Sequence, residues 1–416
     1  MAATNGMVLA ADGTPLKQRL QKTLLRRKLI AVGLVLPLGA FVFFTFLFPI
    51  FMMLFRSVEN PVVHENLPQT VAVLESWNGE DVPGEEAFAA LVADLITARK
   101  SKQIGRVATR MNFETSGVRS VFTSTARKAK KMKPPFKEAM IKANPLWGER
   151  KMWVTIKRMG QPFTATQYLA ALDMKFDVDN NIVMQDEDRQ IYVQIFGRTL
   201  WISFLVAALC FLLGYPVAYL LATLPLKYSN LLMIMVLLPF WTSLLVRTTS
   251  WIVLLQTNGV INDLLVWSGI IDEANRIQMI YNQMGTVIAM THILLPFMIL
   301  PLYSVMKTIP PSYMRAALSL GANPVRAFFR VYAPQTVPGI GAGALLVFIL
   351  SIGYYITPAL VGGRTGQMIS NFIAFHMQKS LNWGLAAALS GILLIGVLFL
   401  YWVYSKIVGV DNMKLG

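Results

Sequence analysis

Long apolar stretches alternate with polar ones along this chain. Six of them are long enough to cross a bilayer, which takes about 20 apolar residues. They lie at 29–55, 199–223, 230–255, 286–306, 337–356 and 384–405. The last five follow closely on one another, whereas the polar segment 56–198 separates the first from the second. The pattern predicts an all-α integral membrane protein with six transmembrane helices and one large domain outside the bilayer.

The segment 56–198 is predicted to be mostly helical. Residues 85–102 place apolar side chains on one helix face, namely Phe88, Leu91, Val92, Leu95 and Ile96. Residues 163–172 are expected to form a short helix that begins with a Thr or Gln cap. Residues 175–184 alternate around an Asp-Asn-Asn turn, which predicts a small β-hairpin.

The composition supports the membrane assignment. The chain is 55% hydrophobic and only 14% charged, whereas soluble domains average about 25% charged residues. A single cysteine, Cys210, excludes an internal disulfide framework. The apolar run 29–55 is too long for the hydrophobic region of a cleaved signal peptide, so we expect it to remain as an anchor.

The positions of the basic residues predict the orientation. The loops on one side of the spans and the tail after the last span hold Lys227, Lys307, Arg315, Arg326, Arg330, Lys406 and Lys414. The tail 1–28 adds Lys17, Arg19, Lys22, Arg26, Arg27 and Lys28, against Asp12. Because short cytoplasmic loops are enriched in Lys and Arg, both tails, 1–28 and 406–416, are predicted to be cytoplasmic. The basic tail is expected to lie against anionic lipid headgroups.

The same orientation places the loop 307–336 in the cytoplasm and the segment 56–198 outside. Long domains cross the membrane largely regardless of their charge, so the basic residues of 56–198 do not contradict this assignment. The cluster at 127–137 contains Arg127, Lys128, Lys130, Lys131, Lys133 and Lys137. It is interpreted as a solvated or headgroup-facing surface, with a docking face for an acidic partner as the alternative; no nucleic-acid partner is expected.

The loop 307–336 contains the start and stop signals of two short helices joined by a turn, an arrangement that we call the hook. Pro311 can open a first helix, and Gly321 can supply the left-handed residue after its end. Asn323 is a good N-cap for a second helix with Pro324 at its first position, and Pro334 is expected to stop that helix. Such a hook between two spans suits a docking lever.

Motifs for catalysis, nucleotide binding and metal binding are absent from the sequence. There is no G-x-x-x-x-G-K-[ST] loop, no Cys/His cluster with metal spacing, and no G-x-S-x-G or H-E-x-x-H motif. His64, His292 and His376 are scattered and are interpreted as structural. The chain is therefore predicted to be no enzyme and to hold no cofactor or metal. The six apolar runs also contain no Asp or Glu, which argues against a proton- or sodium-driven carrier.

Arg247 is the only charged residue inside a predicted span. Its burial there costs a few kcal/mol unless it faces water or a partner group. The surrounding run, 239–251, is rich in hydroxyl side chains and tryptophan, which fits a cavity-lining segment. Snorkelling of Arg247 to the interface beside a belt of tryptophans is the alternative. The small residues of 339–344 favour close packing with another helix.

Several short motifs occur in a fixed order along the second half of the chain. They are Gly214-Tyr215-Pro216-Val217-Ala218-Tyr219, Leu238-Pro239-Phe240-Trp241-Thr242, Leu294-Leu295-Pro296-Phe297-Met298, Pro301-Leu302-Tyr303, Gly366-Gln367-Met368-Ile369-Ser370-Asn371 and Asn382-Trp383-Gly384-Leu385-Ala386-Ala387-Ala388. Together with the hook they resemble the first permease subunit of spermidine/putrescine-type ABC importers. The resemblance covers roughly 163–405 and the first span.

The resemblance implies a type I ABC importer permease fold in a bacterial inner membrane. It implies a second permease subunit, two ATP-binding subunits that hold ATP and magnesium, and a periplasmic substrate-binding protein. The 311–333 hook would couple to the ATPase through Arg315, Ala316, Ala317, Gly321, Asn323 and Arg326. Candidate residues of the substrate pathway are Trp241, Thr242, Arg247, Tyr303 and Tyr354.

The chain departs from the family pattern in two places. Arg315 stands where the family's coupling motif begins with Glu, and about 100 residues, 62–162, are inserted in a first outer loop that is usually short. The Gly and Ala positions of the hook remain, so we expect its fold to survive.

The resemblance implies transport of polyamines or related small organic cations. A polycation favours carboxylates and aromatic faces, and the spans offer only the aromatic faces. Opines and organophosphonates therefore remain alternative cargoes. A self-sufficient carrier or channel, and an adhesion or assembly protein that works through 57–195, remain alternative classes.

Overall fold

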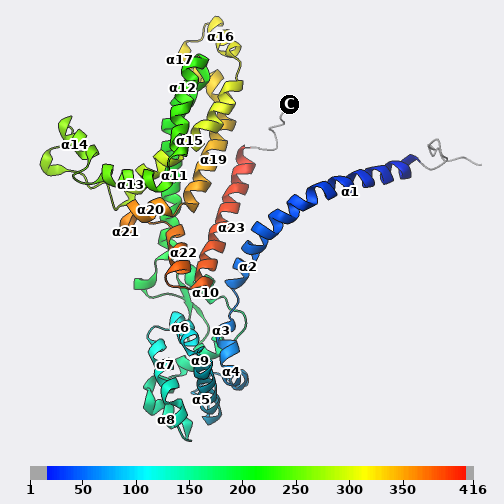
Figure 1. Cartoon of the computed structure of the whole chain (residues 1–416), viewed down its shortest axis with the longest axis vertical. Helices are drawn as coiled ribbons and strands as arrows, with labels where there is room; N and C mark the ends of the chain where they lie inside the picture. Colours follow the sequence, from blue (N-terminus) through cyan, green and yellow to red (C-terminus); the bar gives the residue numbers. More distant parts are fainter. Residues whose placement is uncertain (1–15, 409–416) are drawn as a thin grey trace, which may run out of the picture. The chain divides into compact units, whose positions relative to one another are not determined.

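The structure is a computed structural model that describes residues 16–408; the tail residues 1–15 and 409–416, including Asp12 and Lys414, lie outside the described part. The chain divides into two units, 1–56 and 57–416. In the first unit, α1 (Leu16–Val42), the π-helical turn η1 (Phe43–Leu47) and α2 (Phe48–Arg56) follow one another as a nearly continuous helix (Figure 1). Helix α1 thus begins within the predicted basic tail.

The second unit begins with the insert, residues 61–162, which is built of short helices. These are α3 (Pro61–Asn66), α4 (Pro68–Glu75), α5 (Glu85–Lys100), α6 (Ile104–Glu114), α7 (Val118–Lys128), η2 (Ala129–Lys131), α8 (Phe136–Ala143), η3 (Pro145–Gly148) and α9 (Arg150–Met159). The helix predicted at 85–102 is confirmed as α5. The insert has a hydrophobic core of its own, with fully buried Phe88, Phe122, Trp147 and Trp153. The Trp147 ring centroid lies 5.1 Å from that of Phe122 and 6.1 Å from that of Trp153.

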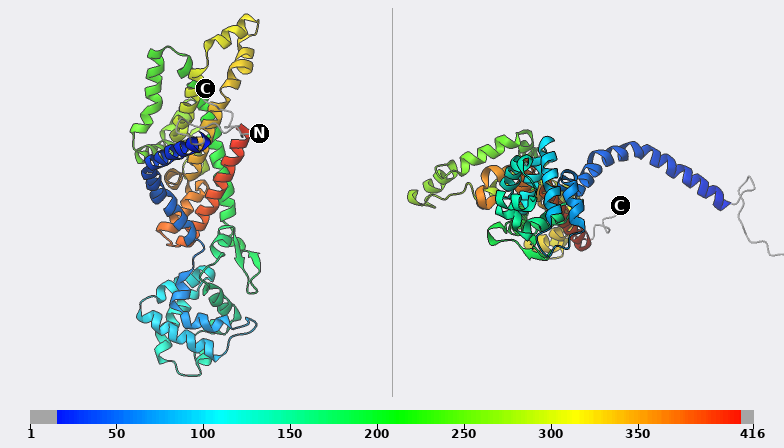
Figure 2. Two further views of the ribbon diagram at one scale, coloured as in Figure 1. Left: turned by 90° about the vertical axis from the view of Figure 1, so that its right-hand side faces the viewer. Right: turned by 90° about the horizontal axis from the view of Figure 1, so that it is seen from below.

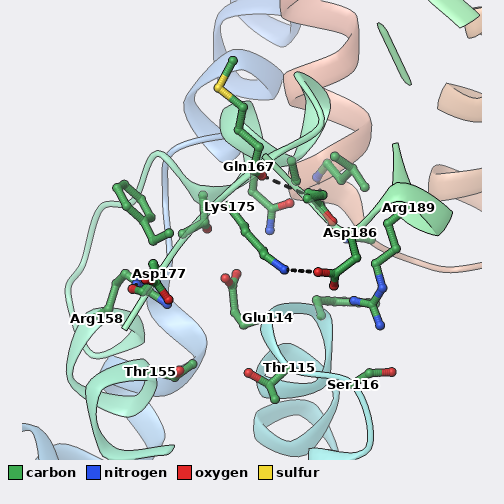
Figure 3. A pocket seen from close by; sticks show the side chains of 18 of the residues that line it. Glu114, Thr115, Ser116, Thr155, Arg158, Gln167, Lys175, Asp177, Asp186 and Arg189 are labelled. Atoms are coloured by element: carbon green, nitrogen blue, oxygen red, sulfur yellow. Dashed lines mark hydrogen bonds and ion pairs between the residues drawn. The ribbon is translucent and has the colours of Figure 1, made fainter. Parts of the chain in front are cut away.

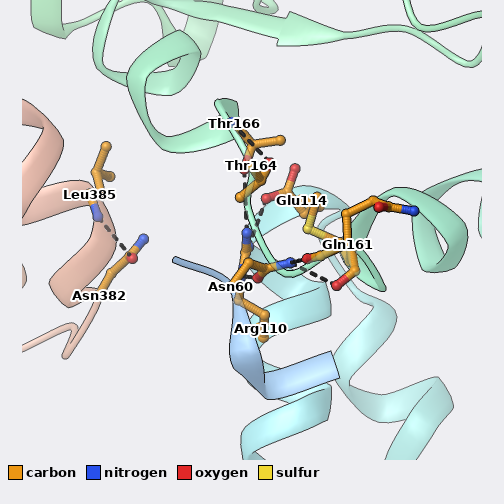
Figure 4. A network of polar contacts seen from close by, with 9 residues as sticks. Asn60, Arg110, Glu114, Gln161, Thr164, Thr166, Asn382 and Leu385 are labelled. Carbon is orange, nitrogen blue, oxygen red and sulfur yellow. Dashed lines mark hydrogen bonds and ion pairs between the residues drawn. The ribbon is translucent and has the colours of Figure 1, made fainter. Parts of the chain in front are cut away.

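The two ends of the insert are held side by side. The backbone N–H of Asn60 donates to Pro162 O at 2.8 Å, and Glu59 pairs with Phe163 in an isolated antiparallel bridge. Arg110 joins this base to the following helix, because it donates to Asn60 Oδ1 at 2.9 Å, to Glu114 Oε1 at 2.7 Å and to Thr166 Oγ1 at 3.3 Å (Figure 4). Entry and exit of the insert therefore form one closed base.

The predicted hairpin is confirmed, and the predicted cap is wrong. Strands β1 (Met174–Phe176) and β2 (Ile182–Met184) pair antiparallel, with Met174 opposite Met184. The short helix predicted at 163–172 is α10 (Thr166–Ala171), whose N-cap is Ala165 with no side-chain bond. A turn replaces the cap, since the backbone N–H of Thr166 donates to Thr164 Oγ1 at 3.2 Å.

The remaining helices contain the membrane-spanning core. They are α11 (Tyr192–Thr223), α12 (Leu226–Leu237), η5 (Leu238–Trp241), α13 (Leu244–Leu255), α14 (Val260–Trp267), η6 (Glu273–Asn275), α15 (Gln283–Thr308), α16 (Pro311–Ser319), α17 (Pro324–Ala327), η7 (Phe328–Tyr332), α18 (Ala333–Gln335), α19 (Val337–Gly353), α20 (Ile356–Val361), α21 (Gly363–Gly366), α22 (Ile369–Gln378) and α23 (Trp383–Val408). Helices α11, α15 and α19 pack against one another through a common core. By length and composition, four described helices can each cross a bilayer. Two further pairs of helices are bent at a short break, and the number of spans rises to six if each pair is counted as one span.

One of the expected spans is bent. The stretch 230–255 is broken: α12 with η5 and α13 with α14 meet at 97°, and α13 and α14 extend away from the bundle (Figure 2). Pro239 lacks a backbone N–H and lies in the 3₁₀ turn η5, and Thr242 and Ser243 that follow are extended, so the helix cannot continue. The first predicted core span also begins earlier than 199, at Tyr192.

The expectation that Pro334 stops the second hook helix is wrong. The helix of α17 continues through the π-helical turn η7 into α18, where Pro334 occupies an initial position, and it bends by 60° only before α19. A proline is accommodated there because Pro334 lies at an initial position of α18, where a backbone N–H is not needed within the helix.

Close backbone approach explains how α15 and α19 pack. A Cβ added at Gly343 would lie 2.8 Å from Met298 Sδ, and one at Gly339 would lie 3.0 Å from Val305 Cβ. The small-residue segment 339–344 thus lies against another helix, as its composition predicted.

Asp173 anchors the first turn of α11. The residue is 3% exposed, and its carboxylate accepts backbone N–H bonds from Ile191, Tyr192 and Val193 at 3.1, 3.0 and 2.8 Å. These N–H groups have no partner within the helix, and a carboxylate also complements the positive end of the helix dipole. The segment after the insert therefore fixes where the first core helix begins.

Replacing Asp173 with Ala should destabilise the core, because the loss of a capping side chain costs about 0.5–2 kcal/mol. The measurement is the thermal unfolding midpoint of the full chain in detergent. Asp81→Ala is the matched control, since Asp81 is exposed and far along the chain from α11. Equal midpoints for the two variants would show that Asp173 does not hold the helix.

Candidate functional site

The hook forms two short helices around a left-handed turn. Gly321 has φ +85°, and Gly321 N–H and Ala322 N–H donate to Leu318 O at 3.0 Å and to Ala317 O at 3.1 Å. This pair of bonds is a Schellman motif, which satisfies carbonyls at the end of α16 and requires a residue that tolerates positive φ. The prediction that Gly321 supplies the left-handed residue after the first hook helix is thus confirmed.

The second hook helix begins as the sequence indicates. Pro311 and Pro324 are at the starts of α16 and α17, and Asn323 Oδ1 accepts the backbone N–H of Arg326 at 3.1 Å. Asn323 is therefore the N-cap of α17.

An aromatic cluster ties the hook to α11. The Phe328 ring centroid lies 5.5 Å from that of Tyr219 and 6.3 Å from that of Tyr215, and it stacks on Tyr332 at 5.6 Å. Tyr215 also shares a hydrogen bond of 3.2 Å with Thr336 at the bend before α19. Edge-to-face and stacked rings of this kind are worth about 0.5–1.5 kcal/mol per pair beyond the area that they bury. The hook is therefore joined to the inner core by rigid side chains.

The outer surface of the hook is apolar and cationic. Leu320 is 89% exposed, and Val325 and Phe329 are also exposed. Arg315 and Arg326 lie on the same exposed segment, and the sequence 307–336 contains no Asp or Glu. Such a surface fits a partner groove with an apolar floor and acidic rims.

A second polar group of residues surrounds Arg247 on α13. Arg247 lies close enough to interact electrostatically with His292 of α15 and with Tyr354 at the end of α19. Its Nε is buried and has no hydrogen-bond partner among the described residues. Trp251 Nε1–H, one turn further along α13, donates to His292 Nδ1 at 3.1 Å. Hydroxyl groups of Thr248 and Thr357 lie 3.3 Å apart and connect α13 to α20.

The predicted pathway residues are only partly brought together. Arg247 and Tyr354 are neighbours. Trp241, which is 83% exposed, is instead the last residue of η5, and Thr242 lies in the break before α13. Tyr303 is half-buried on α15 and packs on the core of α11, α15 and α19.

His292, interpreted from the sequence as structural, packs against Trp251 of α13, with ring centroids 5.4 Å apart. No spacing within the sequence connects residue 292 to residue 251, because the two residues lie on different helices that meet only in the folded chain.

Comparisons with known proteins identify the family. Residues 211–408 match the family described as binding-protein-dependent transport system inner membrane component. The spermidine/putrescine transport system permease protein PotB of Salmonella typhimurium is 33% identical over 252 residues, which cover 60% of this chain and 86% of the relative. PotB of Haemophilus influenzae is 36% identical over 225 residues, 54% of this chain and 78% of the relative. The chain belongs to the binding-protein-dependent inner membrane permeases.

A solved structure is also similar to part of this permease. It is a bacterial alginate ABC transporter in complex with an alginate pentasaccharide-bound periplasmic protein, with 18% identity, a TM-score of 0.45, and coverage of 56% of this chain and 82% of that one. Membership of this family means that the chain is a membrane-embedded transporter subunit and not an enzyme. The family-matched range 211–408 includes the hook and Arg247 and excludes the insert.

Replacing Gly321 with Val should open the hook turn, because a non-glycine residue in the left-handed region costs about 1–2 kcal/mol and a β-branched residue is the least tolerant. Hydrogen exchange at the amides of Gly321 and Ala322 reports the Schellman bonds, and the position-321 and Ala322 amides should exchange faster in the variant. Gly269→Val is the matched control, since Gly269 also has positive φ, +74°, and open space at its Cβ. If exchange in the hook is unchanged in Gly321→Val, the turn does not depend on glycine.

Proposed function

We propose that this permease is the transmembrane subunit of an ATP-driven importer for polyamines or related small organic cations. The observation that carries the proposal is similarity over most of the length of relatives that are named spermidine/putrescine permeases. The aromatic side chains around Arg247 support it, since aromatic faces attract organic cations. The permease is expected to bind its cargo weakly, with selectivity set by a separate binding protein.

The proposed assembly contains this chain, a second related permease, two ATP-binding subunits that hold ATP and magnesium, and a periplasmic substrate-binding protein. The lack of a phosphate-binding loop in the sequence supports ATP hydrolysis in other chains. The positive-inside pattern supports cytoplasmic tails, a cytoplasmic hook and an insert on the periplasmic side of the inner membrane.

Coupling would run through the hook. An ATP-binding subunit would contact the exposed surface of α16 and α17, with Arg315 and Arg326 facing acidic groups and Ala316 and Ala317 allowing close approach. The aromatic cluster around Phe328 would pass the displacement to α11 and, through the bend before α19, to the bundle. The bundle would then alternate between outward-open and inward-open arrangements as a two-state element.

The substrate pathway would pass the polar group around Arg247. Arg247 and Tyr354 would line it together with Trp251 and His292, and Trp241, Thr242 and Tyr303 would lie along its length. A buried guanidinium in this position would hold water or an anionic group and would limit how long a polycation remains bound.

The test is reconstitution of the complete assembly in lipid discs, with ATP hydrolysis and transport measured together. Binding protein loaded with spermidine or putrescine should stimulate ATP hydrolysis several-fold, and empty binding protein should not. Gly321→Val should abolish the stimulation while leaving assembly intact, and the control Gly269→Val should behave like the unmodified chain.

Two outcomes contradict the proposal. If the chain alone moves putrescine across a bilayer without ATP, it is a self-sufficient carrier. If binding protein loaded with an opine or an organophosphonate stimulates hydrolysis and polyamines do not, the coupling stands and the cargo class is wrong.

A further inference from the structure

A cavity of about 640 Å³ lies at the start of α11, between the insert and the core. Its wall comes from the end of α6, one face of α9, helix α10, the hairpin and the end of α22. Small-molecule sites in proteins have volumes of about 300–1,000 Å³, so the cavity has the size of a ligand site. None of its lining residues belongs to the hook or to the group around Arg247. Most of them also precede residue 211, where the match to the family begins.

The charged groups of the wall balance one another. Four carboxylates and four cationic groups line the cavity: Glu114, Asp177, Asp186 and Asp188, with Lys151, Arg158, Lys175 and Arg189. In Figure 3, Glu114 lies between Arg158 and Asp177 on one side and Asp186 and Arg189 on the other. A wall of zero net charge gives a polycation or a polyanion little net attraction. A ligand with both signs of charge pairs with both kinds of group.

The cationic groups of α9 form a stripe along the cavity. Lys151 and Arg158 are two helical turns apart and therefore lie on the same face as Val154 and Thr155, which also line the wall. The guanidinium of Arg158 stacks on the Phe176 ring at 5.2 Å. The stripe presents positive charge from the insert side.

Arg158 lacks a full set of acceptors. Its Nη1 makes only two long hydrogen bonds of 3.3 Å, to Asp177 O and Asn180 Oδ1. Its Nε is buried and has no partner among the described residues. Burial lowers the pKa of Arg158. The negative charges of Glu114 and Asp177 act in the opposite direction and raise it, but the effect of burial is larger. The Nη1 bonds are at the long end of the hydrogen-bond range, so the guanidinium can still pair with a ligand carboxylate, which forms stronger, charge-assisted bonds.

Two carboxylates of the wall, on Asp177 and Asp188, accept no hydrogen bond from another side chain within residues 16–408. Asp186, by contrast, is already engaged: Lys175 Nζ lies 2.7 Å from its Oδ1, and this bond, with the charges of Arg189 and Lys151, lowers the pKa of Asp186. Glu114 is also engaged, by Arg110.

We propose that this cavity binds a small zwitterion, an amino acid or amino-acid derivative, with its carboxylate on the α9 stripe and its ammonium group on one of the two carboxylates without a side-chain partner, Asp177 or Asp188. Such a ligand would bridge the insert to the hairpin, to Tyr192 at the start of α11 and to His376 of α22. It would therefore favour one placement of the insert on the core. The proposal does not depend on polyamines being the transported cargo.

The test uses three linear probes with four carbon atoms each, a zwitterion, a dication and a dianion: 4-aminobutanoate, putrescine and succinate. Binding to the full-length chain in lipid discs is measured by equilibrium dialysis. The zwitterion 4-aminobutanoate should bind at least about ten-fold more tightly than the dication or the dianion, a difference of about 1.4 kcal/mol. Stronger binding of putrescine or succinate, or no binding of any probe, would overturn the proposal.

Two variants locate the site. Arg158→Met should weaken 4-aminobutanoate binding at least ten-fold, whereas Arg119→Met, on an exposed face of α7 outside the cavity, should leave it unchanged. The double variant Asp177→Asn with Asp188→Asn removes two exposed carboxylates and preserves the side-chain shapes. It should lose affinity for 4-aminobutanoate and gain affinity for succinate, because the wall then carries a net positive charge. If 4-aminobutanoate binds equally to all variants, it binds elsewhere and the assignment is wrong.

Discussion

Close contact between helix backbones at a few glycines holds the core of this permease together. Gly214 of α11 approaches the side chains of Met298 and Ile299 on α15, and Gly343 of α19 approaches both the side chain and the backbone of Met298. In a bilayer, helices gain little from hiding apolar surface from one another, so association depends on this kind of close packing. Because the contacts are tight, a displacement of one helix is passed to its neighbours rather than absorbed by loose side chains.

The two ends of this core are held by different chemistry. At one end the aromatic cluster of Tyr215, Tyr219, Phe328 and Tyr332 joins the hook to α11. At the other end the carboxylate of Asp173 caps α11 through three backbone N–H groups. Helix α11 therefore connects the hook to the segment that carries the insert. The insert departs from and returns to a closed base at Asn60 and Pro162, which explains how about 100 residues fit into one loop without disturbing the core.

The sequence predicted the features that depend on local chemistry. The apolar stretches, the Asp-Asn-Asn hairpin, the glycine turn of the hook and the Asn323 cap each follow from residues a few positions apart. It failed where distant residues decide the geometry. Pro334 is accommodated at an initial position of α18, and the stretch 230–255 bends at Pro239. His292 meets Trp251 from a different helix, and the cavity charges come from α6, α9, the hairpin and the segment 186–189.

The central claim is that the hook moves with the C-terminal end of α11 as one body. Spin labels can test it in a chain whose single cysteine, Cys210, is replaced by Ala. One pair, Leu320→Cys with Leu220→Cys, spans the hook and the C-terminal end of α11; a second pair, Leu320→Cys with Leu381→Cys, spans the hook and the loop before α23. On trapping the assembled transporter with nucleotide, the first distance should stay constant and the second should change. A change in the first distance with a constant second distance would contradict the account, because the hook would then move without the core.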